Sequence, residues 1–200
     1  MDPVNIPGGA GNIEAVLERI PGSTLGAVLC HPHPLYGGSM HDGVLASIDD
    51  ACREAGISTL RFNFRGVGGS GGEHDRGVGE SDDVAMLANW MRDECASDAV
   101  FLGGYSFGAG IALRAAARVQ PRAVVLVAPP VAMIEPLVAQ ACRALVLLGE
   151  HDTIVDAEAA AALFESNPQA RVHIVRGADH FFMGAGPEIE RTVAKFLSEA

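Results

Sequence analysis

The stretch Gly104-Tyr105-Ser106-Phe107-Gly108 is the most informative segment of this chain. An apolar run, residues 99–103, precedes it, and a helix-forming run, residues 109–117, follows it. The pattern Gly-x-Ser-x-Gly between a strand and a helix is typical of a sharp turn that presents the serine hydroxyl. The helix N-terminus then directs backbone N–H groups at any anion held there. We expect glycine at both flanks because side chains there would collide with the neighbouring strand and helix. The alternative is a glycine-rich turn with a structural serine.

Strand-like and helix-like runs alternate along the rest of the chain. The strand-like runs are continuous and rich in Val and Leu, which is typical of parallel strands buried on both faces. We therefore predict an α/β fold in which helices cover both faces of a mostly parallel sheet, in a single domain spanning residues 1–200. The predicted strands are 14–20, 25–30, 59–64, 99–103, 122–128, 144–148 and 172–175, and the predicted helices are 41–55, 79–94, 109–117 and 190–197.

The composition disfavours several classes of partner. With a net charge of −11, the surface should repel nucleic acids and anionic lipids. No apolar run reaches the roughly 18 residues that a membrane span needs. Residues 1–7 lack the basic and apolar segments of a signal peptide, so we expect a cytoplasmic protein. The cysteines form no Cys-x-x-Cys pair and are predicted to be buried free thiols; they are Cys30, Cys52, Cys95 and Cys142.

A nucleophilic serine requires a base, and the base requires a group that orients it. In an open parallel sheet, the functional site lies beyond the carboxyl ends of the strands. Asp152 and His180 each follow a predicted strand, and together with Ser106 they occur in the chain order Ser, Asp, His. We therefore predict that Ser106 is the nucleophile, His180 the base and Asp152 the acid that orients the base.

Neighbouring residues offer alternatives for these roles. His151 is a rival base, although its use would leave the loop after the last strand without a role. Glu150 and Asp156 are rival acids, but Glu150 should point away from Asp152 in an extended chain, and Asp156 could cap the following helix. Asp179 adjoins the predicted base, yet the side chains of adjacent residues diverge.

An oxyanion needs two N–H donors. The first is predicted to be Phe107, directly after the serine. The second should come from the loop His31-Pro32-His33-Pro34-Leu35-Tyr36-Gly37-Gly38, which follows a strand. Because proline has no N–H, the donor is His33, Leu35 or Tyr36, with His33 the first choice. The histidines of this loop lack a nearby Asp, Glu or Cys partner, so we expect neither a metal site nor a cofactor.

Five segments of the chain together resemble the α/β-hydrolase superfamily. The resemblance is to small bacterial members with a His-Pro-His-Pro-x-x-Gly-Gly loop and a minimal cap or none. In the family pattern, the nucleophile, acid and base fall on Ser106, Asp152 and His180. The first segment departs from the usual His-Gly-x start of the oxyanion loop, because it contains prolines at 32 and 34. The five segments are 31–38, 62–70, 104–108, 149–152 and 177–182.

This resemblance implies a cofactor-independent, carboxylesterase-like serine hydrolase that cleaves a small-molecule ester. A thioesterase or small-amide hydrolase would use the same residues, and a non-catalytic binding protein on this scaffold is the alternative of a different class. The segment 129–143 has room for one short helix and no lid, so we expect short-acyl or otherwise soluble esters and a monomer or homodimer. The predicted substrate contacts are Leu35, Tyr36 and Phe181, with Phe107, Val131, Met133 and Phe182 as further rim candidates.

Overall fold

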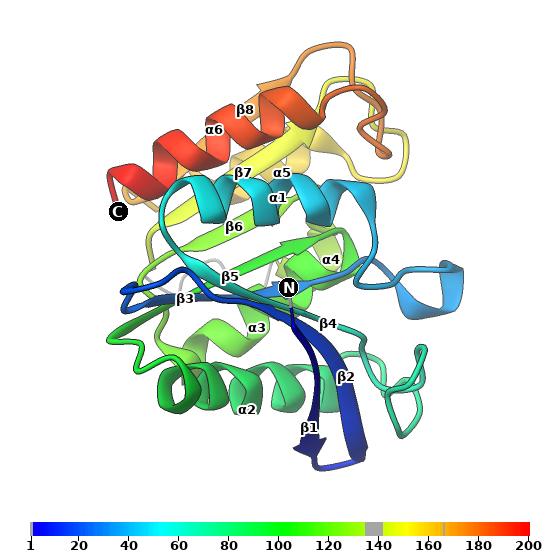
Figure 1. Ribbon diagram of the computed structural model, residues 1–200. Helices are drawn as coiled ribbons and strands as arrows, with labels where there is room; N and C mark the ends of the chain where they lie inside the picture. Colours follow the sequence, from blue (N-terminus) through cyan, green and yellow to red (C-terminus); the bar gives the residue numbers. More distant parts are fainter. Residues whose placement is uncertain (1, 135–141, 166) are drawn as a thin grey trace.

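The computed structural model describes residues 2–134, 142–165 and 167–200, and its strands form an eight-stranded sheet (Figure 1). The strand order is β1-β2-β4-β3-β5-β6-β7-β8. The pairs β1–β2 and β2–β4 are antiparallel, and all other neighbours are parallel. The strands are β1 (Asp2–Gly8), β2 (Gly11–Glu18), β3 (Leu25–Cys30), β4 (Ser58–Phe62), β5 (Ala99–Tyr105), β6 (Val124–Val127), β7 (Ala144–Gly149) and β8 (Ala170–Val175).

Helices cover both faces of the sheet, as predicted. Figure 1 shows α1 and α6 side by side over one face, with α2 and α3 over the other. Each helix layer contributes to its own hydrophobic core, because the sheet separates the two layers. The helices are α1 (Gly43–Glu54), α2 (Val78–Glu94), α3 (Phe107–Val119), α4 (Val131–Ile134), α5 (Ala157–Phe164), α6 (Gly186–Ser198) and the 3₁₀ turn η1 (Pro34–Tyr36).

The first strand is the main departure from the predicted elements. No strand was expected before residue 14, yet β1 pairs with β2 along its full length. It is an edge strand in which Ile6 is buried and most other residues are exposed, so it carries no continuous apolar run. Pro3 and Pro7 also obscure it, since proline is tolerated in a strand only at an edge or an end.

The sheet order places the predicted site residues at one edge. The strands β5, β7 and β8 are parallel and lie close together in the sheet, so the loops after them converge. Ser106, Asp152 and His180 lie in these three loops. Within the residues that the structure describes, no helix has the length and apolar character needed to cross a membrane.

Candidate active site

Ser106 occupies a strained turn between β5 and α3. Its backbone has φ 53° and ψ −119°, a conformation that is uncommon outside glycine. A Cβ on Gly104 would lie 2.4 Å from the carbonyl carbon of Gly108. A Cβ on Gly108 would lie 2.1 Å from the carbonyl oxygen of Cys30, at the end of β3. Both flanks must therefore be glycine, as predicted, because the helix start packs directly against the two strands.

The three predicted catalytic side chains form a hydrogen-bonded series. The Nε2 atom of His180 lies 3.1 Å from Oγ of Ser106, and its Nδ1 atom lies 2.7 Å from Oδ2 of Asp152. These contacts fit a neutral imidazole that donates Nδ1–H to the carboxylate and accepts the serine hydroxyl proton at Nε2. The hydroxyl of Tyr105 donates to the carbonyl oxygen of His180 at 2.7 Å, which fixes the base's backbone.

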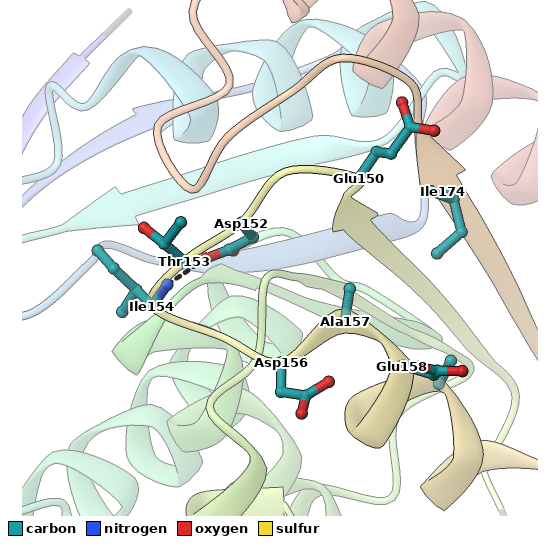
Figure 2. A pocket seen from close by; sticks show the side chains of 9 residues that line it. Glu150, Asp152, Thr153, Ile154, Asp156, Ala157, Glu158 and Ile174 are labelled. Atoms are coloured by element: carbon teal, nitrogen blue, oxygen red, sulfur yellow. Dashed lines mark hydrogen bonds between the residues drawn. The ribbon is translucent and has the colours of Figure 1, made fainter.

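The loop after β7 holds the Asp152 carboxylate in place. Its Oδ1 atom accepts the N–H groups of Ile154 and Val155, both at 2.8 Å, while Oδ2 is free to face His180. Figure 2 shows the first of these contacts at the border of an open hollow of about 780 Å³. The side chain of Asp152 is 1% exposed. A carboxylate held by two N–H groups cannot rotate away from the base without breaking them.

The rival residues have other partners. Asp156 caps α5 by accepting the N–H of Ala159, and Glu150 accepts the N–H of Gly177. In Figure 2, both side chains point away from that of Asp152. The exposed ring of His151 lies 3.9 Å from Glu150, whereas the ring within hydrogen-bond distance of Ser106 is that of His180. Asp179 accepts the N–H of Phe181 in its own loop.

In the loop after β3, one of the three N–H groups that could stabilise an oxyanion has no hydrogen-bond acceptor among the described residues. The N–H of Leu35 donates to Nδ1 of His33, and the N–H of Tyr36 donates to the carbonyl oxygen of His33. Within the described residues, no acceptor contacts the N–H of His33. The N–H of Phe107 lies at the start of α3 and, among the described residues, has no acceptor either.

His31 has a structural place at the base of this loop. Its Nδ1 lies 2.6 Å from the carbonyl oxygen of Pro32, and its Nε2 accepts the N–H of Phe64. Burial lowers the pKa of His31 to about 4, so the ring is neutral at pH 7. Both nitrogens are occupied and cannot ligate a metal. Among residues 2–134, 142–165 and 167–200, no group of three potential metal ligands comes together.

Ser106 and His180 open into a pocket of about 880 Å³. Of the predicted substrate contacts, Tyr36 and Phe181 line this pocket, whereas Leu35 is exposed outside it. Of the further rim candidates, Phe107 and Met133 line the pocket, and Val131 and Phe182 do not. The sequence analysis did not identify three basic residues in the lining, which are His74, Arg76 and Arg114.

Residues 28–142 match the model of the alpha/beta hydrolase fold family. The chain belongs to this family. This α/β hydrolase is 33% identical to an α/β serine hydrolase homologue from Coxiella burnetii, with a TM-score of 0.92 over 97% of this chain and 96% of that chain. It is 31% identical to an α/β serine hydrolase without a lid from Xanthomonas campestris, with a TM-score of 0.88 over 99% and 94% of the two chains. An uncharacterized protein of Rickettsia prowazekii is 34% identical over 185 residues, covering 86% of this chain and 77% of that protein.

These relatives support hydrolase activity for this α/β hydrolase and confirm the predicted fold class. Of the segment in which a lid would lie, the structure describes the short helix α4. Residues 135–141 lie outside the described part of the chain.

Proposed function

We propose that the protein hydrolyses carboxylic esters of small molecules through an acyl-serine intermediate. The contact that carries this proposal is the 3.1 Å approach of His180 Nε2 to Ser106 Oγ, on the wall of an open pocket. A serine becomes an effective nucleophile when a base of this kind is within hydrogen-bond reach and is itself oriented.

In the proposed reaction, His180 accepts the proton of Ser106 as Oγ attacks the ester carbonyl carbon. The N–H groups of Phe107 and His33 stabilise the resulting oxyanion. Asp152 stabilises the imidazolium that forms, and its contacts with the backbone keep the ring in the productive tautomer. His180 then protonates the departing alcohol. Water, deprotonated by the same ring, attacks the acyl-serine and releases the acid.

Two observations favour His33 as the second donor. Its N–H lacks an acceptor among the described residues, whereas the other two candidate N–H groups are used within the turn. Its ring also packs 4.8 Å from the ring of Phe107, which brings the two proposed donors to the same part of the pocket.

Labelling by a fluorophosphonate probe, together with turnover of p-nitrophenyl butyrate, tests the proposal. We expect Ser106→Ala to abolish both labelling and turnover while the circular dichroism spectrum stays unchanged. Ser198→Ala is the matched control, because this serine is exposed at the end of α6, and it should label and turn over normally. Turnover that persists in Ser106→Ala would refute the proposed mechanism.

A further inference from the structure

The pocket at Ser106 has a cationic end. Arg76, from the loop before α2, and Arg114, on α3, both line it. Arginine accounts for nearly all of the positive charge of this acidic chain, and six of the thirteen arginines form ion pairs with carboxylates outside this pocket. One turn beyond Arg114, for example, Arg118 forms an ion pair with Asp82. Among the described residues, neither pocket arginine has an ion-pair partner.

A buried carboxylate holds the backbone on both sides of Arg76 by hydrogen bonds. Glu80 is fully buried, and its two oxygens accept the N–H groups of Asp75 and Gly77, both at 2.8 Å. Arg76 lies between these two anchored residues and has φ 50°, a backbone angle that residues other than glycine adopt only at a cost in free energy. Strain of this kind persists only where the surroundings impose it, and here Glu80 holds the backbone on both sides of Arg76.

Arg114 lies beside the same loop and close to the proposed oxyanion donor. A Cβ built on Gly77 would lie 3.4 Å from Nη1 of Arg114 and 4.0 Å from the ring of Phe107. The guanidinium of Arg114 is therefore next to both the loop that carries Arg76 and the first residue of α3. Of the carboxylates, Asp42 lines the pocket, and its Oδ1 accepts two N–H groups at the start of α1.

The sheet order separates this cationic end from the base. Arg76 is in the loop after β4, His180 is in the loop after β8, and β5, which Ser106 directly follows, lies between these strands. The departing alcohol must face His180 to receive its proton. The acyl part of an ester attacked by Ser106 therefore extends away from His180, toward the loop after β4 that carries Arg76 and that Arg114 adjoins.

We propose that Arg76 and Arg114 bind an anionic group on the acyl part of the substrate, so that the preferred substrates are half-esters of dicarboxylic acids. This inference rests on the proposed ester hydrolysis. A guanidinium pairs with a carboxylate through directional, charge-assisted hydrogen bonds. An acidic protein surface repels such a substrate, so a preference for it requires a local cationic site.

Three methyl esters with acyl groups of similar length test the preference: monomethyl adipate, its primary amide and methyl 6-aminohexanoate. We expect kcat/KM to be at least about tenfold higher for the anionic ester than for the amide, and higher for the amide than for the amine. The preference should shrink as salt is raised from about 0.05 to 0.5 M, since exposed charges are screened. Equal values for the anionic ester and the amide would overturn the proposal.

Variants locate the effect. Arg76→Ala and Arg114→Ala should each reduce the anion-to-amide ratio of kcat/KM by about fivefold or more, chiefly through KM, and Arg114→Glu should favour the amine. Arg191→Ala is the matched control, because this arginine on α6 lies outside the pocket and has no ion-pair partner among the described residues, so the ratio should stay unchanged. A ratio that falls equally in Arg191→Ala would show an effect of net charge and overturn the site.

Two further measurements separate this proposal from ester hydrolysis itself. If the fluorophosphonate labels Ser106 and the amide is hydrolysed without an anionic preference, only the cationic site is refuted. If neither labelling nor turnover occurs, the hydrolase proposal fails, and calorimetric binding of monomethyl adipate to Ser106→Ala, compared with the Ser106→Ala/Arg114→Ala variant, still tests the site. A preference for 4-acetoxybenzoate over 4-acetoxybenzamide without the acyl-side preference would contradict the placement on the acyl side.

Discussion

Replacement of His31 by glutamine should remove a large part of the protein's sensitivity to acid. Burial lowers the pKa of His31 to about 4, from a usual value of 6.5. Below pH 6.5 the unfolded chain binds a proton at this residue, whereas the folded chain stays neutral until about pH 4. The unfolded state therefore binds more protons in this window, and the free energy of unfolding falls as the pH falls. The gap between the two pKa values corresponds to roughly 3 kcal/mol in total.

Urea unfolding at several pH values between about 8 and 4.5, followed by circular dichroism, measures this effect. Glutamine cannot be protonated, and its amide oxygen can still accept the N–H of Phe64 that His31 accepts at 3.0 Å. At pH 8 we expect the free energy of unfolding of His31→Gln to be about 1 kcal/mol below that of wild type, because the contact with Pro32 is imperfectly replaced. As the pH falls, the free energy of unfolding should decrease less in His31→Gln than in wild type. His151→Gln is the control, because it removes an exposed ring. An unchanged pH dependence in His31→Gln would refute this reasoning.

The remaining predictions concern turnover. His180→Ala should lose about as much kcat as Ser106→Ala, and the double variant no more than either, because the residues act as one unit; additive losses would contradict this. Asp152→Asn should lose at least a few hundredfold in kcat, since the ring would lose its orienting acceptor; full activity would contradict this. Activity should survive exhaustive dialysis against EDTA, and a loss that zinc restores would indicate a metal site. Among neutral p-nitrophenyl esters, kcat/KM should peak at acyl chains of roughly two to six carbons, since each methylene adds about 0.8 kcal/mol until the pocket is full; a preference beyond about ten carbons would contradict an open site.

The strand-end positions of the candidate site were predictable from the sequence. Continuous apolar runs marked the buried strands, and the chemistry-bearing residues directly after them had to meet at one edge of a parallel sheet. The Ser106 turn was marked by its flanking glycines. A side chain on Gly104 would collide with the backbone of Gly108, and one on Gly108 would collide with the carbonyl oxygen of Cys30. In each case a local pattern carried the information.

Features that depend on long-range contacts could not be predicted in this way. The place of His31 depends on the N–H of Phe64, which is 33 residues away in the chain. No local pattern distinguishes this histidine from His33, two residues later, which faces the pocket. Likewise, Arg76 and Arg114 come from separate elements and line one pocket because the loop before α2 lies against α3. The glycine-rich sequence before α2 gives no periodicity from which that packing could be inferred.

Because this pocket has a cationic end, the net charge of the protein does not predict which small ligands it binds. A net charge of −11 acts over distances comparable to the Debye length of about 10 Å at 0.1 M salt, and at that range it opposes approach of extended polyanions such as nucleic acids. A small anion inside a pocket experiences the nearest charges instead. Some arginines are neutralised by a neighbouring carboxylate, as Arg65 is by the buried Asp83 and Arg118 is by the exposed Asp82. The two pocket arginines have no such partner among the described residues, so an acidic protein can repel large anions and still select a small one, as the proposed half-ester specificity requires.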